Sequence, residues 1–173
     1  GKHFIRKRHV TIKIGDTIPS LDLFVMGEDG GPQAISTDEL FKDKVVALFG
    51  LPGAFTPTCS ASHLPGYVQH ADALREKGVD DIICISVNDA FVMTAWGIDQ
   101  NVEGRVRMVA DGSALFAKAT GLELDLTERG LGMRSQRFSM IVENGVVKDI
   151  ATEDPPTAEA TGAEAMLDKI AAA

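Results

Sequence analysis

The sequence predicts an α/β fold in which helices flank a mixed central sheet, and three observations support this prediction. Apolar runs typical of buried strands alternate along the chain with segments of helical periodicity. The dipeptide Asn144-Gly145 between two apolar runs is a strong hairpin signal, which adds an antiparallel pair. The length of 173 residues, 45% of them hydrophobic, suits a single core. We therefore expect one domain over residues 11–173, preceded by an N-terminal extension over residues 1–10.

The first third of the chain predicts a strand, a short helix and a second strand. Residues 12–27 alternate apolar and polar side chains and lead into a glycine-rich, hairpin-like turn. Ser36 and Glu39 stand at the spacing of a capping box, so a short helix is expected to begin there. The continuous apolar run Lys44–Leu51, which is rich in valine, is typical of a buried central strand.

A longer helix is expected over residues 58–77, because apolar side chains recur there at helical spacing. Pro65 and Gly66 should kink or break this helix in its first turns, and Gly78 should end it.

The rest of the chain continues the alternation of strands and helices. The expected elements are a buried strand at 81–87, a helix from Asn88 or Asp89 to about Gln100, a strand at 106–111, a helix at 113–122 ended by Gly121, the hairpin at 136–150 and an alanine-rich helix within 154–173.

Charge and cysteine count exclude several classes of protein. A formal net charge of −8 makes nucleic acid an improbable partner, and no apolar run is long enough to cross a bilayer. The basic opening stretch reads as a solvated extension or as the remnant of a longer targeting sequence. Two cysteines form neither a disulfide scaffold nor a zinc signature. We expect a reducing compartment, either the cytoplasm or, for a processed form, an organelle.

The first cysteine, Cys59, follows the predicted central strand where the next helix begins. Pro57 suits the first helical turn, so free N–H groups and the helix dipole should favour a thiolate at Cys59. The Thr56 hydroxyl could reach the sulfur and hold an incoming O–O group, and Pro52 would keep water from the thiolate. The alternative is an ordinary small buried cysteine beside a proline-rich turn.

The segment "PGAFTPTCSASHLPGYV" resembles the active-site segment of peroxiredoxins, whose pattern P-x-x-x-[TS]-x-x-C is met by Pro52, Thr56 and Cys59. The residues around this pattern are most similar to those of the peroxiredoxin 5, or type II, branch, and the resemblance extends over roughly residues 11–150. The resemblance implies a thioredoxin-like fold and a thiol-dependent peroxidase without metal or organic cofactor. Such an enzyme reduces H2O2 and alkyl hydroperoxides through a sulfenic acid, here on Cys59.

The resemblance also implies an arginine that holds the thiolate and the peroxide oxygens. Arg137, at the start of the predicted strand "RFSM", stands at that position. The alternative is a solvent-exposed arginine at a strand edge, and Arg134 is near enough to assist. In the family, loops around the active site also form a homodimer contact, for which Phe55 is a candidate.

The second cysteine, Cys84, stands where plant-like type II peroxiredoxins carry a second cysteine that can resolve the sulfenic acid as a disulfide. Its neighbours Ile83 and Ile85 favour a buried core thiol instead. No cysteine follows Cys84, although the animal-type resolving cysteine lies near the C-terminus. This departure predicts a cycle with one cysteine, reduced directly by glutathione, glutaredoxin or thioredoxin.

Three other functions compete with this interpretation. The chain could be a non-catalytic interaction module with an incidental cysteine, or a metal- or haem-binding protein that uses Cys59 and His63. Because a single Cys-x-x-x-His pair is weak support for a metal, a packing or pocket-rim position is favoured for His63. Disulfide exchange is disfavoured because Thr56 stands where a CxxC motif needs its first cysteine.

Overall fold

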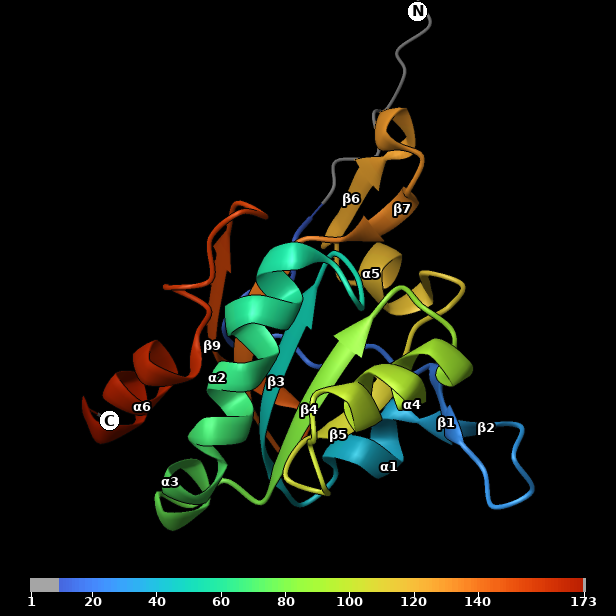
Figure 1. The fold of residues 1–173 in the computed structure, drawn as a ribbon. Coiled ribbons are helices and arrows are strands. Elements are labelled where there is room, and N and C mark those ends of the chain that lie inside the picture. Colours follow the sequence, from blue (N-terminus) through green and yellow to red (C-terminus); the bar gives the residue numbers. More distant parts are fainter. Residues whose placement is uncertain (1–9, 173) are drawn as a thin grey trace, which may run out of the picture.

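One mixed sheet of seven strands forms the centre of the computed structural model, which describes residues 10–172 (Figure 1). The strand order is β2-β1-β5-β4-β3-β8-β9, and β6 pairs with β7 in a separate two-stranded sheet. The strands are β1 (Asp22–Met26), β2 (Pro32–Ser36), β3 (Val45–Leu51), β4 (Asp81–Ser86), β5 (Arg107–Ala110), β6 (Glu123–Leu126), β7 (Gly132–Ser135), β8 (Arg137–Glu143) and β9 (Val146–Glu153).

Helices lie on both faces of the seven-stranded sheet. The helices are α1 (Thr37–Phe41), α2 (Leu64–Gln69), α3 (Ala71–Glu76), α4 (Ala90–Asp99), α5 (Leu115–Ala119) and α6 (Ala163–Ala172), with a π-helical turn η1 (Cys59–His63) and a 3-10 turn η2 (Thr127–Arg129). The predicted N-terminal extension over residues 1–10 lies outside the described residues, except for Val10. Within the described part of the chain, no helix is both long enough and apolar enough to cross a membrane.

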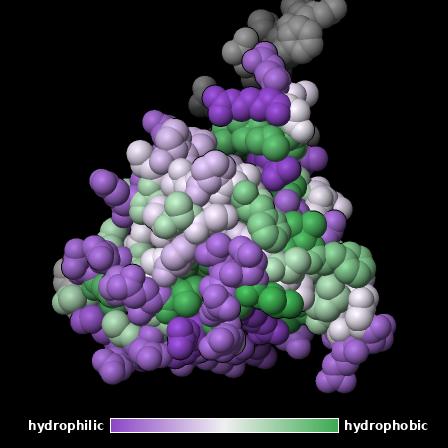
Figure 2. All heavy atoms as spheres, viewed as in Figure 1, coloured by the Kyte–Doolittle hydropathy of each residue, from purple (hydrophilic) through white to green (hydrophobic). Residues whose placement is uncertain are grey.

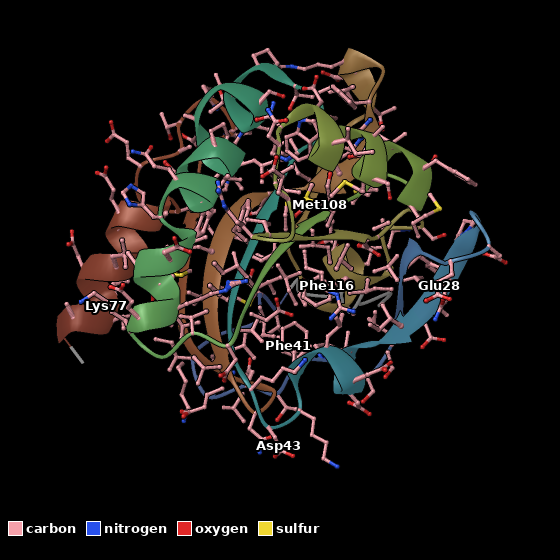
Figure 3. All side chains as sticks on the ribbon, turned by 60° about the horizontal axis from the view of Figure 1, so that its bottom comes forward. Glu28, Phe41, Asp43, Lys77, Met108 and Phe116 are labelled. Atoms are coloured by element: carbon pink, nitrogen blue, oxygen red, sulfur yellow. The ribbon has the colours of Figure 1, made fainter. Side chains whose placement is uncertain are left out.

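Strand β3 carries side chains of both core clusters, because successive residues of a strand point to opposite faces. Phe49 and Leu51 pack with residues of α2, α3, α4 and α6. Leu48 packs on the other face with α1 and α5, which contribute Phe41 and Phe116 near the middle of Figure 3. On the face seen in Figure 2, apolar residues are interspersed with hydrophilic ones. The prediction of a buried central strand is confirmed.

The parallel and antiparallel pairing of the strands agrees with the predicted mixed sheet. Strand β3 pairs in parallel with β4, and β4 with β5, whereas β8 and β9 pair antiparallel. Asn144 and Gly145 both have positive φ angles, 47° and 77°, as the predicted type I′ turn requires. Two predicted helix caps are confirmed as well: Ser36 accepts from the Glu39 amide, and Asp89 accepts from the Val92 amide.

Three features differ from the sequence prediction. Strand β2 was not predicted, because its five residues lie between the glycine-rich turn and the short helix. The hairpin β6–β7 was not predicted, because its strands of four residues are short and only partly buried. The helix predicted over residues 58–77 is divided at His70, whose φ of −99° and ψ of 11° separate α2 from α3.

Candidate active site

Cys59 follows the carboxyl end of β3 by way of a loop over residues 52–56, and it lies just after helical backbone begins at Pro57. Pro57 has no N–H to pair, so it occupies the first helical position without losing a hydrogen bond. Cys59 is therefore inside the first turn, as predicted. Its side chain is 1% exposed, so the sulfur is held in the interior.

The helix that carries Cys59 passes into a π-helical turn after its first two residues. The Leu64 amide donates to the Cys59 carbonyl, five residues back, and Pro65 follows directly. In an α-helix the Pro65 ring would clash with the carbonyl four residues back, and the π turn lies directly before this proline. The predicted distortion near Pro65 thus takes the form of a π turn. Such turns are frequent at functional sites.

The Arg137 guanidinium contacts three other residues of the buried site. It stands first in β8 and is 1% exposed, so the alternative of a solvent-exposed strand-edge arginine is wrong. Its Nη2 donates to the Cys59 sulfur at 3.2 Å and to the Pro155 carbonyl at 2.8 Å. Its Nε donates to the same carbonyl at 3.1 Å, and its Nη1 contacts Nδ1 of His63 at 2.8 Å. The planar fork of arginine therefore has a partner along each edge.

His63 is a neutral partner of this arginine. A guanidinium can only donate, so Nδ1 of His63 accepts, and Nε2 carries the proton that goes to the Thr161 carbonyl at 3.1 Å. The Tyr67 hydroxyl donates to that carbonyl as well, at 2.7 Å. Burial, and then the adjacent Arg137 charge, lowers the pKa of His63 from its ordinary 6.5 to about 3. His63 is thus packed in the interior, and it also orients the arginine.

The neutral state of His63 predicts a pH dependence of stability. The unfolded chain binds a proton at this residue below pH 6.5, whereas the folded protein does not until about pH 3. The free energy of unfolding should therefore fall by about 1.4 kcal/mol per pH unit as the pH drops below 6.5. Urea titrations at pH 6.5 and 5.0 should differ by about 1.6 kcal/mol in the wild type, because His63 of the unfolded chain is already half protonated at pH 6.5. In His63→Gln this difference should be largely lost, and an equal slope in both proteins would contradict the assignment.

The loop between β3 and the helix is held from two sides. Arg134 donates to the Pro52 carbonyl at 3.0 Å, and Gly53 allows this approach because a Cβ there would lie 2.4 Å from the guanidinium. On the other side, the Asn88 side chain accepts from the Ala54 amide at 2.9 Å. Pro52 is buried, as expected of a residue that walls a site. Arg134 therefore supports the loop, and within the described part of the chain it makes no hydrogen bond to the sulfur of Cys59.

Thr56 is half-buried, and its hydroxyl donates to the Gly53 carbonyl at 2.6 Å. Among the described residues no hydrogen bond joins this hydroxyl to Cys59, so the contact with the sulfur expected from the sequence is not made. A hydroxyl that donates one proton keeps lone pairs that can accept another. The Thr56 hydroxyl can therefore still accept a hydrogen bond.

Cys84 lies in the middle of β4, opposite Phe49, and its side chain is fully buried. Burial, and then the proximity of Cys59, raises the pKa of the Cys84 thiol well above its ordinary value. The prediction of a buried core thiol is confirmed. Both cysteines are free thiols in this structure.

The metal- or haem-binding alternative does not fit the contacts of its two residues. The Cys59 sulfur and Nδ1 of His63 both accept from Arg137, so a fixed cation already lies between them. A metal ion would have to displace this guanidinium against charge repulsion.

Three partners in the site were missed by sequence reasoning. Pro155 and Thr161 act through backbone carbonyls, which every residue carries, so no residue type signals them. Asn88 was considered only as a helix cap, but its place directly after a predicted buried strand is a signal for a site residue.

Comparisons with known proteins identify the family of the chain. The sequence profile of the redoxin family matches residues 13–167. Peroxiredoxin-2D of Arabidopsis thaliana is 47% identical over 133 residues, which cover 77% of this chain and 82% of the relative. The crystal structure of reduced Prx3 from Vibrio vulnificus in complex with H2O2 is 49% identical, with a TM-score of 0.87 over 92% of this chain and 99% of that chain.

Peroxiredoxin 5 from Alvinella pompejana is also similar, at 31% identity and a TM-score of 0.83, over 94% of this chain and 99% of that chain. The predicted thioredoxin-like fold is thereby confirmed. From the matched family, these identities and the shared fold, we conclude that the chain belongs to the peroxiredoxin family and is a thiol-dependent peroxidase.

Proposed function

We propose that Cys59 is the peroxidatic nucleophile of this enzyme. The observation that carries the proposal is the 3.2 Å hydrogen bond from Arg137 to the buried sulfur of Cys59. The Cys59 thiolate attacks the terminal oxygen of H2O2 or an alkyl hydroperoxide, so an S–O bond forms as the O–O bond breaks. The leaving oxygen takes a proton and departs as water or an alcohol, and cysteine sulfenic acid remains. The relative solved with H2O2 supports peroxide as the substrate.

Three further residues have roles in this proposal. Arg137 stabilises the thiolate and the negative charge that moves onto the leaving oxygen. Thr56 accepts a hydrogen bond from the peroxide, since its own proton is committed to Gly53. Pro52, which is buried, excludes water from the sulfur.

An external thiol is the reductant that fits this chain best. The thiolate is the attacking species in disulfide chemistry, and the raised pKa of Cys84 keeps that thiol protonated near neutral pH. Cys84 also lies inside a paired central strand, where movement toward Cys59 would break the sheet. We therefore propose reduction of Cys59 by glutathione with glutaredoxin, or by thioredoxin.

Cys84→Ala tests the choice of reductant. If an external thiol reduces Cys59, the variant should keep peroxide turnover within about twofold of wild type. Assays with glutathione and glutaredoxin, and separately with thioredoxin, would identify the reductant. Turnover that collapses in Cys84→Ala, while the first oxidation step stays fast, would assign Cys84 as the resolving cysteine and overturn the one-cysteine cycle.

We also propose that the enzyme is a homodimer. We further propose that it is found in a reducing compartment, either the cytoplasm or an organelle. The surface next to the site supports the dimer, because Phe55 is 54% exposed and is held at a positive φ of 61°. A bulky residue rarely adopts this backbone conformation without a role for the strained segment.

A further inference from the structure

The segment after β9 touches the candidate site through its backbone. Residues 154–162, which we call the clasp, connect β9 to α6 and run beside α2 in Figure 1. The Pro155 carbonyl accepts two hydrogen bonds from Arg137, and the Thr161 carbonyl accepts one from His63. The clasp thus supplies an acceptor to the arginine directly and supports its other edge through the histidine.

The clasp has little hydrophobic anchoring of its own. It contains no helix or strand, and Thr161 is its one fully buried residue. Segments with few buried apolar contacts have low local stability unless polar contacts fix them. Another group must therefore hold the two carbonyls in place.

The Glu153 carboxylate, at the end of β9, makes four such polar contacts with the clasp, beside one hydrogen bond from the Thr58 hydroxyl to the Pro156 carbonyl at 3.1 Å. Its Oε1 accepts from the Thr157 hydroxyl at 2.7 Å and from the Glu159 amide at 3.0 Å. Its Oε2 accepts from the Thr161 amide at 2.6 Å and from the Thr161 hydroxyl at 2.5 Å. These four donors match the four acceptor sites of an ionised carboxylate. Burial alone would raise the pKa of Glu153, but the hydrogen bonds from Thr161 and Thr157 lower it to about 2.

Glu153 is connected to the Cys59 sulfur through the clasp and then through Arg137. Glu153 also lies directly opposite Arg137 in the β8–β9 register, so the clasp begins beside the arginine that it holds. The Pro155 carbonyl binds Nε and Nη2 of Arg137, and the same Nη2 points at Cys59. Because the guanidinium is a rigid plane, a partner fixed on this edge sets the direction of the bond to the sulfur.

We infer that Glu153 is a positioning residue of the peroxidase site: its carboxylate folds the clasp so that the Pro155 and Thr161 carbonyls aim Arg137 at Cys59. The inference rests on the roles proposed above for Cys59 and Arg137.

Glu153→Gln tests this role by the sign of its effect. As a mere charge, Glu153 stabilises the Arg137 cation and disfavours the Cys59 thiolate, so its neutralisation would favour the thiolate. As a positioning residue it has the opposite effect, because a misaligned arginine stabilises the thiolate less. Glutamine keeps the size of the side chain but places an NH2 group against donors. A threonine hydroxyl can rotate and accept a hydrogen bond from this NH2 group, whereas the backbone N–H of Glu159 or Thr161 can only donate.

The measurement is the pH dependence of Cys59 alkylation by iodoacetamide, in a Cys84→Ala background so that one thiol reacts. The second measurement is the rate of reaction with H2O2, followed by the fluorescence of Trp96, whose indole donates to the Ser60 hydroxyl next to Cys59. An adjacent arginine shifts the titration of an acid by about 1–3 units, so we expect the alkylation midpoint to rise by about one unit in Glu153→Gln. The peroxide rate should fall by about tenfold.

Glu159→Gln is the matched control, because it removes the same charge from an exposed side chain of the same segment. It should leave the midpoint and the rate unchanged. Thr157→Val removes one donor to Glu153 and should shift the midpoint upward by a smaller amount, which decides the question if Glu153→Gln does not fold. A midpoint that is unchanged or lower in both variants would overturn the inference. A wild-type protein without a fast peroxide reaction would instead overturn the proposed roles of Cys59 and Arg137.

Discussion

Replacing Cys59 by serine is expected to abolish peroxide turnover. A serine hydroxyl does not ionise near neutral pH, so no anion is available to attack the O–O bond. Serine is close to cysteine in size and can accept the hydrogen bond that Arg137 now gives to the sulfur at 3.2 Å. The fold should therefore survive, which circular dichroism and urea unfolding would check. Turnover would be measured with H2O2 and with an alkyl hydroperoxide, at saturating reductant.

The control for Cys59→Ser is Cys84→Ala, which removes the other thiol from the buried core. Loss of turnover in the first variant and its retention in the second would assign the chemistry to one sulfur. Peroxide turnover close to the wild-type rate in Cys59→Ser would remove Cys59 as the nucleophile.

Replacing Arg137 by alanine should slow the reaction with peroxide by about 10²–10³-fold, the scale of a lost oxyanion donor. The substitution removes the hydrogen bond to the Cys59 sulfur and the positive charge beside it. It also leaves the Pro155 carbonyl and Nδ1 of His63 without their donor inside the protein. Stopped-flow mixing with H2O2 would give the rate constant of the first step, and iodoacetamide alkylation would report the thiolate fraction.

Two further variants check that a slow reaction in Arg137→Ala is not caused by a general loss of folding. Arg137→Lys keeps the charge, but one ammonium group cannot reach all three acceptors, so an intermediate rate is expected. Arg134→Ala removes a neighbouring guanidinium that binds the Pro52 and Leu131 carbonyls, and its effect should stay below about tenfold. A rate within about twofold of wild type in both Arg137 variants would place Arg137 outside the site.

Local signals in the sequence predicted most of the sheet and the start of the site. Valine-rich β3, the Asn144-Gly145 turn and the Ser36 cap each depend on neighbouring residues, so the sequence alone was sufficient for them. The same holds for Cys59, because Pro57 and the preceding strand determine its position in the first helical turn.

The parts that were not predicted depend on contacts between distant segments. His63 and Arg137 are 74 residues apart, and their hydrogen bond forms only when β8 pairs with β3 beside the helix. The Pro155 and Thr161 carbonyls could not be identified, because a backbone oxygen has no residue type. The hydroxyl of Thr56 was expected at the sulfur but donates to Gly53, since a nearby carbonyl in the tight loop takes its proton.

The most direct test of the central claim is the intact mass of the reduced protein after one equivalent of H2O2, with a sulfenic-acid trap present. We expect one trapped oxygen on Cys59 and an unmodified Cys84 thiol, because such an enzyme is reduced by an outside thiol. Peptide mapping would locate the adduct. Loss of two hydrogens without trapping would show a Cys59–Cys84 disulfide and contradict the one-cysteine cycle. An unmodified Cys59 would contradict its assignment as the nucleophile.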